Sequence, residues 1–155
     1  SVALNRVIQS ALNVFDARWI NVLHSCGSKN VLPEPSKHYR PVHYIHEMAR
    51  AYLAADLIIA RSGAITCSEA NALSRYALFI PLPIGNGEQE VNARSLIAQG
   101  RAEVVSQKNF TPEWLATHID ELMERSAARN VEGSYSDRDA AWKIANYMES
   151  ALESR

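Results

Sequence analysis

The stretch DLIIARSGAITCSEA, residues 56–70, decides the fold, because a short apolar run gives way abruptly to small and hydroxyl side chains. Residues 56–60 predict a buried strand, and residues 66–74 predict a helix that follows it closely. A strand that is apolar along almost its whole length is typical of a parallel sheet covered by helices on both faces. This junction therefore predicts one unit of an α/β fold.

The alternation of strand and helix extends from this stretch in both directions. Apolar patterning predicts further strands at residues 19–24, 41–45, 77–81 and 102–105, and further helices at residues 2–15, 47–54, 90–99 and 111–125. Thr111, Pro112 and Glu113 have the order typical of a helix start, and Gly100 has the position typical of a helix end. The sequence thus predicts an α/β domain with a doubly wound, Rossmann-like parallel sheet.

A last helix is predicted from residue 137 to about residue 152, after a break at Gly133 and Ser134. Its apolar stripe can cover this domain or pack on a neighbouring one. Residues 1–155 are therefore expected to form one domain, in which the helix within residues 136–155 is the element that would contact an N-terminal domain missing from this chain.

Composition restricts the class of protein. The chain has 155 residues, of which 47% are hydrophobic and 21% are charged, an ordinary proportion for a globular domain. Its formal charge of −1 and its pI near 6.5 give no basic field, so no nucleic-acid partner is expected. Cys26 and Cys67 lie far apart and outside any CxxC pair, which argues against a zinc site or a disulfide framework and favours a reducing cytosol.

The ends of the chain also carry expectations. No apolar stretch approaches the length of a transmembrane helix, and residues 1–5 lack the features of a signal peptide. A helical pattern that opens without a methionine suggests a piece excised from a longer protein.

Ligands of doubly wound sheets bind at the carboxyl ends of the strands, so the segments that follow the predicted strands are considered first. Three such segments are residues 44–46, 61–66 and 83–89. The chain contains no G-x-S-x-G elbow, no G-x-G-x-x-G fingerprint and no Walker pattern. Local motifs therefore indicate an edge suited to anions and do not name a reaction.

Ser62, Gly63, Ala64 and Thr66 have side chains small enough for a ligand to approach the free N–H groups of a helix start, which attract anions. The carboxylate of Glu69 would repel a phosphate bound at this helix start, so Glu69 needs either a structural role or a ligand group other than the phosphate. In a structural interpretation, Thr66 and Glu69 form a capping box in which each side chain binds the backbone N–H of the other. In a functional interpretation, a diphosphate lies near Ile65 and Thr66 while Glu69 accepts hydrogen bonds from two ribose hydroxyls. This segment alone leaves both open.

Glu88 and Gln89 follow a loop that contains Asn86 and Gly87. In a structural interpretation, Asn86 and Gly87 form a tight turn and the acidic residues favour the start of a helix. In a functional interpretation, Glu88 and Gln89 present adjacent acceptors and a donor to the hydroxyls of a sugar.

Tyr44 and Ile45 are of residue types that usually belong to the core at the end of a strand. In a nucleotide-binding cleft, Tyr44 would instead cover a base and the main chain of Ile45 would pair with its edge. His43 and His46 straddle a change from strand to helix without a carboxylate fixed beside them, so they predict a structural or surface role and no metal.

Taken in order, these segments resemble the C-terminal domain of the MurG family, bacterial glycosyltransferases that make lipid II, the last cytoplasmic peptidoglycan precursor. The matching stretches are LN (4–5), HSCG (24–27), YIHEMARAYLAADLIIARSGAITCSEA (44–70), ALFIPLPIGNGEQEVNA (77–93) and AQGRAEVV (98–105). Two segments depart from the family pattern. Ser74, Arg75 and Tyr76 stand where the family usually has Gly-Leu-Pro, and residues 25–26 replace the usual residues after His24.

The resemblance implies the C-terminal half of a two-domain GT-B glycosyltransferase, whose C-terminal domain holds UDP-N-acetylglucosamine. It implies that the main chain of Ile45 contacts uracil, with Tyr44 beside it. It also implies that Ile65 and Thr66 contact the phosphates and that Glu69 binds the ribose.

For the sugar, the resemblance implies that Ala64, Glu88 and Gln89 face the N-acetylglucosamine. Met48 would lie close by, and Asn92 would support the site. The implied substrate-binding residues are Tyr44, Ile45, Met48, Ser62, Gly63, Ala64, Ile65, Thr66, Glu69, Glu88, Gln89 and Asn92.

The reaction implied by the resemblance is an inverting transfer from UDP-N-acetylglucosamine to the 4-hydroxyl of the muramoyl sugar of lipid I. No metal or other cofactor is expected, because main-chain N–H groups at Ile65 and Thr66 can stabilise the departing UDP. No other catalytic residue is assigned in this fragment, which is expected to be inactive alone. Lipid I and the cytoplasmic face of the plasma membrane would be contacted through the missing N-terminal domain. The glycine-rich loop that the resemblance implies just before Ser1 is also missing.

Two alternatives stay open on the sequence. The chain can be a naturally separate donor-binding subunit of a split glycosyltransferase, completed by a membrane-anchored partner. It can also belong to a related transferase that acts on a glycolipid or a natural product.

Overall fold

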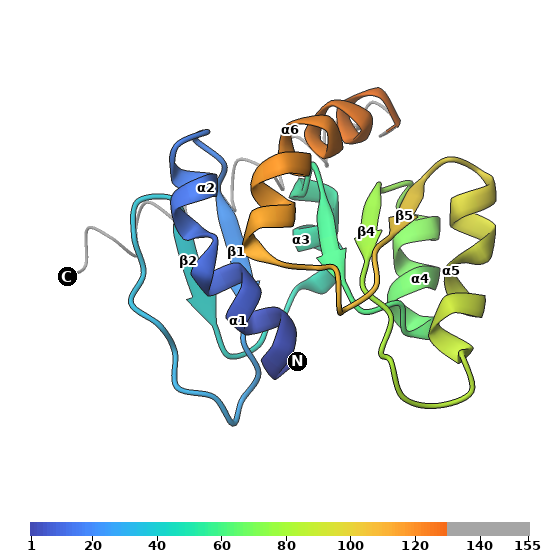
Figure 1. Cartoon of the computed structure of the whole chain (residues 1–155), viewed down its shortest axis with the longest axis horizontal. Helices are drawn as coiled ribbons and strands as arrows, with labels where there is room; N and C mark the ends of the chain where they lie inside the picture. Colours follow the sequence, from blue (N-terminus) through green and yellow to red (C-terminus); the bar gives the residue numbers. More distant parts are fainter. Residues whose placement is uncertain (130–155) are drawn as a thin grey trace.

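The computed structural model describes residues 1–129 (Figure 1). In chain order its elements are α1 (Val2–Ser10), α2 (Leu12–Asp16), β1 (Val22–Ser25), β2 (Tyr39–Val42), α3 (Met48–Ala54), β3 (Ile58–Ala60), α4 (Ala64–Ala72), β4 (Ala77–Phe79), α5 (Glu88–Ala98), β5 (Ala102–Val104) and α6 (Pro112–Arg129). The predicted alternation of strands and helices is confirmed. The helix predicted at 137–152 lies outside the described residues.

All of the strand pairs are parallel, and they form two hydrogen-bonded groups. β1 pairs with β2, and β4 lies between β3 and β5 in a second group. Figure 1 shows the first group at the left of the molecule, and β4 and β5 toward the right. The prediction of an α/β domain with parallel strands is confirmed, although the hydrogen-bonded ladder of the described residues is not continuous from β2 to β5.

The side chains of β4 alternate between two hydrophobic clusters. Leu78 lies in a cluster with α1 and α6, whereas Phe79 lies in a cluster with α4 and α5. Both side chains are completely buried. Because helices cover both faces of β4, its residues read as a continuous apolar run in the sequence.

The structure corrects several predicted boundaries in the first part of the chain. The helix expected at residues 2–15 is interrupted at Ala11, where φ is −106° and ψ is 10°. The first strand begins at Val22 and not at Trp19, whose φ of +56° is incompatible with a strand. The second strand is Tyr39–Val42, so the prediction of 41–45 was two to three residues late.

Two predicted helix ends are confirmed by their hydrogen bonds. The hydroxyl of Thr111 accepts a bond from the backbone N–H of Trp114 at 3.0 Å, as expected for an N-cap. Gly100 follows α5 with φ at +67°, and the N–H of Arg101 bonds back to the carbonyl of Leu96 at 2.9 Å. Glycine adopts this left-handed conformation without steric cost, which explains why α5 ends there.

Ser74 carries backbone strain that the family pattern avoids. Its φ is +54°, a left-handed value that costs a residue other than glycine about 1 kcal/mol, and the MurG family usually has glycine here. We expect Ser74→Gly to raise the free energy of unfolding by about 0.5–1 kcal/mol, because removal of the Cβ relieves this strain. Urea denaturation measures the difference. Ser74→Ala is the control, and an equal gain in both variants would contradict the explanation.

Candidate functional site

The helix α4 starts directly after β3 at the carboxyl edge of the sheet. Its N-cap is Gly63, with φ at −64° and ψ at 155°, and no side chain caps it. The N–H of Cys67 bonds to the carbonyl of Gly63 at 3.0 Å, so the helix begins two residues earlier than predicted. Thr66 is therefore inside the first turn and is not the N-cap. The capping-box interpretation of Thr66 and Glu69 is wrong.

The absence of a side-chain cap leaves the start of α4 open. The first N–H groups of a helix have no partner within it and carry the positive end of its dipole. Here they belong to Ala64, Ile65 and Thr66, and Ile65 has 75% of its surface exposed. An apolar side chain this exposed beside free N–H groups is consistent with a surface that binds a ligand or a second domain.

Glu69 lies one turn further along α4 and is half-buried. Tyr52 of α3 is its neighbour: burial raises the pKa of the Tyr52 phenol, and the negative charge of Glu69 raises it further. The side chain of Thr66 also lies beside this phenol. α3 and α4 thus meet at Glu69, which has no capping role and keeps a carboxylate at the edge of the site.

Ser62 links the starts of α4 and α5. The side chain of Ser62 is completely buried, and its carbonyl accepts a hydrogen bond from Nδ2 of Asn92 at 3.1 Å. Its hydroxyl has no hydrogen-bond partner within the described part of the chain. Asn92 therefore holds the segment that leads into α4.

The loop before α5 is held by Gln89. Its Oε1 accepts a hydrogen bond from the backbone N–H of Leu82 at 2.8 Å, which closes the loop over residues 82–89. Gly87 is the N-cap of α5 and has a φ of +76°, a value that favours glycine. Glu88 is the first residue of α5 and is exposed. Within residues 1–129, the amide nitrogen of Gln89 and the carboxylate of Glu88 form no hydrogen bond.

Tyr44, Ile45 and Met48 come from the segment between β2 and α3. Tyr44 is 63% exposed, so the interpretation of this residue as core is wrong. The segment departs from the sheet after Val42, which is why Tyr44 escapes burial. Its ring contacts that of His46 edge to face at 5.2 Å, while Ile45 and Met48 are half-buried.

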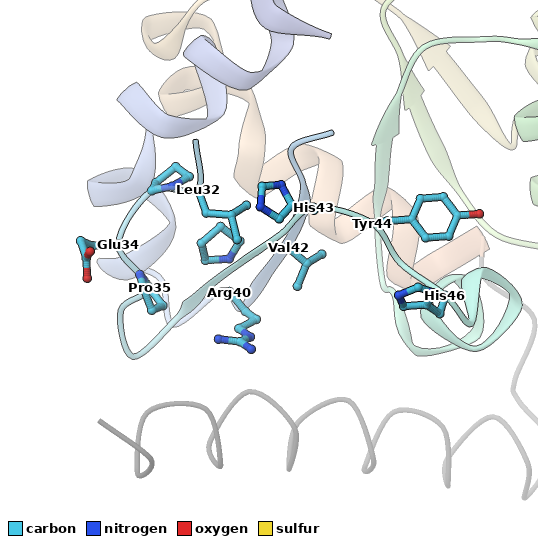
Figure 2. A pocket seen from close by; sticks show the side chains of 10 residues that line it. Leu32, Glu34, Pro35, Arg40, Val42, His43, Tyr44 and His46 are labelled. Carbon is cyan, nitrogen blue, oxygen red and sulfur yellow. The ribbon is translucent and has the colours of Figure 1, made fainter. Parts of the chain in front are cut away.

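A cavity of about 360 Å³ lies on one side of Tyr44 (Figure 2). Its lining comes from residues 32–35, residues 40–44 and His46. Figure 2 shows the ring of Tyr44 extending away from Leu32 and Pro35. Most of these residues were not predicted from the sequence; the two prolines at 33 and 35 were the only signal of a fixed loop. Nδ1 of His43 contacts the carbonyl of Gly27 at 3.1 Å, in keeping with a structural role.

A smaller cavity of about 250 Å³ lies between α4 and α5. It is lined by Ala64, Cys67, Ser68, Asn71, Asn92, Ser95 and Leu96. The structure thus brings Ala64 and Asn92 together, while neither of the two cavities contains Glu69, Glu88 or Gln89. The predicted residues therefore do not line a single pocket: Tyr44 lines the larger cavity, and Ala64 and Asn92 line the smaller one.

Arg61 is a residue of this edge that the sequence did not single out. It follows β3 directly and donates hydrogen bonds to groups at the ends of three other segments. Its only sequence signal was an arginine placed between an apolar strand and Ser62.

Within residues 1–129, no group of three or more His, Cys, Asp or Glu side chains is arranged to hold a metal ion. In the same residues, no helix has both the length and the apolar character needed to cross a membrane.

Comparison with protein families gives a match over residues 1–146 to the glycosyltransferase family 28 C-terminal domain. The chain is 41% identical over 137 residues to the UDP-N-acetylglucosamine–N-acetylmuramyl-(pentapeptide) pyrophosphoryl-undecaprenol N-acetylglucosamine transferase of Corynebacterium glutamicum (strain R), covering 88% of this chain and 38% of that protein. The protein of the same name from Clavibacter sepedonicus is 34% identical over 158 residues, which cover 99% of this chain and 43% of that protein. The chain thus spans less than half the length of these relatives.

Solved structures give similar folds. The crystal structure of Acinetobacter baumannii MurG superposes with a TM-score of 0.66 at 27% identity, over 94% of this chain and 46% of that chain. A glycotransferase of kitacinnamycin superposes with a TM-score of 0.61 at 18% identity, over 94% of this chain and 39% of that chain. The second similarity bears on the fold alone.

Proposed function

Because the chain belongs to glycosyltransferase family 28, whose C-terminal domain it matches, we propose that it binds the nucleotide-sugar donor of a MurG-like hexosyltransferase. The donor is UDP-N-acetylglucosamine, and the acceptor is the 4-hydroxyl of the muramoyl sugar of lipid I, so that the product is lipid II. Lipid I binds a domain N-terminal to this one, at the cytoplasmic face of the plasma membrane. The names of the relatives from Corynebacterium glutamicum and Clavibacter sepedonicus support this donor and this class of acceptor.

One observation carries the proposal for this chain: α4 begins at Gly63 without a side-chain cap, and Glu69 stands one turn behind the open N–H groups. The N–H groups of Ile65 and Thr66 suit an anionic diphosphate. A carboxylate one turn away suits a neighbouring group that donates hydrogen bonds, such as a pair of ribose hydroxyls. A nucleoside diphosphate has both groups next to each other: a diphosphate that accepts hydrogen bonds and a ribose whose hydroxyls donate them.

The remaining predicted residues are assigned to the ends of the donor. Exposed Tyr44 covers the uracil, and the main chain of Ile45 pairs with the edge of the base. At the other end, Ala64, Glu88 and Gln89 face the N-acetylglucosamine. Gln89 offers its amide nitrogen to the sugar because its oxygen already holds the N–H of Leu82.

The chemistry is an inverting displacement. The oxygen of the acceptor hydroxyl forms a bond to the anomeric carbon, the bond from that carbon to the UDP oxygen breaks, and the hydroxyl proton passes to a base on the acceptor domain. Negative charge grows on the departing diphosphate. Main-chain N–H groups at the start of α4 stabilise that charge where it develops, which is the electrostatic part of catalysis.

Calorimetric titration with UDP-N-acetylglucosamine, UDP, UDP-glucose and a thymidine equivalent tests the proposal. We expect binding of the uridine ligands and a preference for the N-acetyl sugar. Titration of the full-length protein accompanies that of the 155-residue chain, since a glycine-rich loop upstream would contribute to the site. Failure of the full-length protein to bind any uridine ligand would refute the proposal.

A pair of variants at Gln89 separates its two roles. Gln89→Glu keeps an acceptor for the N–H of Leu82 and removes the donor to the sugar, whereas Gln89→Ala removes both. We expect Gln89→Glu to retain the melting temperature and to lose about fivefold to tenfold in affinity for UDP-N-acetylglucosamine, the scale of one net hydrogen bond. Affinity for UDP should change much less. An equal loss with UDP would contradict a contact with the sugar.

A further inference from the structure

Arg61 is fixed at the carboxyl edge by hydrogen bonds from both terminal nitrogens of its guanidinium. One nitrogen donates to the carbonyls of Ile80 at 3.2 Å and Pro81 at 3.1 Å. The other donates to Oγ of Ser1 at 2.8 Å and to Oε1 of Gln107 at 2.6 Å. The side chain thus joins the end of β4 to the start of α1 and to the segment after β5.

All four of these partners are uncharged. Burial lowers the pKa of the Arg61 guanidinium, and none of its hydrogen-bond partners within residues 1–129 is a carboxylate. A partly buried cation without an acidic neighbour is costly, because neither water nor a counter-charge fully compensates it. The fork of N–H groups on its two terminal nitrogens serves all four acceptors, yet none of these acceptors brings a negative charge. The charge is therefore the feature that calls for an explanation.

The guanidinium lies at the carboxyl edge of the sheet, beside the start of α1 and the segment after β5, and Arg61 stands two residues before the N-cap of α4. Nε of Arg61 and Oγ of Ser62 are both buried, and neither has a hydrogen-bond partner within the described chain. Two successive residues thus keep unused polar atoms where β3 passes into α4, beside helix N–H groups that also favour an anion.

We propose that Arg61 is a positioning residue for the diphosphate of the donor, whose negative charge it attracts and which neutralises its guanidinium on binding. This inference rests on the proposed function, since it assumes a nucleoside diphosphate at the start of α4. Arg61 acts through its charge and through the strand ends that it holds together. The same contacts keep the guanidinium in place before the ligand arrives, so little reorganisation accompanies binding.

Titration of the full-length protein with UDP and with uridine tests the role of the Arg61 charge. Uridine lacks the diphosphate, so a general loss of folding would weaken the binding of both ligands. Arg61→Gln removes the charge, Arg61→Lys retains it, and Arg94→Gln is the matched control on the exposed surface of α5. We expect Arg61→Gln to lose about tenfold to hundredfold in UDP affinity, the scale of one unit charge acting over several ångströms at an effective dielectric constant of about 20. Uridine affinity should be unchanged, and Arg61→Lys should recover most of the UDP affinity.

Ionic strength gives a second readout that a purely structural role would not change. Added NaCl should weaken UDP binding to the wild type and to Arg61→Lys more than to Arg61→Gln. Equal losses for UDP and uridine, or equal losses in the glutamine and lysine variants, would overturn the inference. If Arg61→Gln does not fold, Arg61→Lys decides by keeping or losing the preference for UDP over uridine. If the wild-type protein binds neither UDP nor uridine, the proposed function itself is refuted. That outcome differs from failure of the Arg61 proposal, in which the wild type still binds UDP.

Discussion

Glu69→Ala is expected to weaken UDP binding about 10- to 100-fold, because the variant loses charge-assisted hydrogen bonds to the ribose worth about 1.5–3 kcal/mol. The carboxylate stands one turn behind the start of α4, beside Tyr52. Its half-buried position lets it reach a ligand at the edge of the domain while the negative charge stays away from the proposed phosphate position.

The same substitution should leave the free energy of unfolding nearly unchanged. A capping box between Thr66 and Glu69 would make the alanine variant about 1 kcal/mol less stable. The N-cap of α4 is instead Gly63, and no side chain caps this helix, so Glu69 does not stabilise its start. Loss of the neighbouring negative charge should also bring the pKa of Tyr52 down, since that charge is one of the causes that raise it.

Comparison of UDP with 2′-deoxy-UDP isolates the ribose contact. The wild type should prefer UDP, and Glu69→Ala should lose most of that preference because a carboxylate that bridges two hydroxyls needs both of them. Glu90→Ala, which removes an exposed carboxylate from α5, is the control for net charge. A folded Glu69→Ala protein with unchanged UDP affinity would rule out the ribose role.

Local patterns were sufficient to predict the fold class and several helix ends. The buried run at β4 and the cap at Thr111 depend on neighbours in sequence, and both are observed. The resemblance to the MurG family is confirmed by the family match and by relatives at 34% and 41% identity. The family could be identified only from several motifs in a fixed order, because each motif alone also fits an ordinary turn or helix cap.

Features that depend on contacts distant in sequence could not be predicted. The early start of α4 follows from the extended backbone at Gly63, which a capping-box pattern at Thr66 concealed. Gln89 turns back to Leu82, and Arg61 reaches Gln107, 46 residues away. Which groups such polar side chains meet depends on how the strand ends are placed side by side, and that placement is a property of the whole fold.

Acidification between about pH 6.5 and pH 4 is expected to destabilise the domain through a single buried histidine, His24. Its Nε2 lies 2.9 Å from Oδ1 of Asn5, and its Nδ1 lies 2.8 Å from the hydroxyl of Tyr39. Asn5 donates through Nδ2 to the carbonyl of Cys26 at 2.9 Å, so its Oδ1 is left as an acceptor. The neutral imidazole therefore carries its proton on Nε2 and accepts at Nδ1 from Tyr39.

Burial lowers the pKa of His24 to about 4. An unfolded chain takes up this proton near pH 6.5, whereas the folded chain resists it until the pH falls to about 4. Stability from this group is therefore complete above pH 6.5 and decreases as the pH falls toward 4. The total loss is about 3 kcal/mol, as expected for a difference of about 2.5 pKa units.

Urea denaturation at a series of pH values measures this loss, and His24→Gln is the matched variant. Carboxylates also titrate in acid, so the informative quantity is the free energy of unfolding of the wild type minus that of the variant. The difference should be constant above pH 7 and should shrink by about 3 kcal/mol toward pH 4, because glutamine cannot take up the proton. Parallel pH profiles would show that the imidazole takes up its proton at the same pH in the folded and unfolded states, which contradicts the hydrogen bond that Tyr39 donates to it.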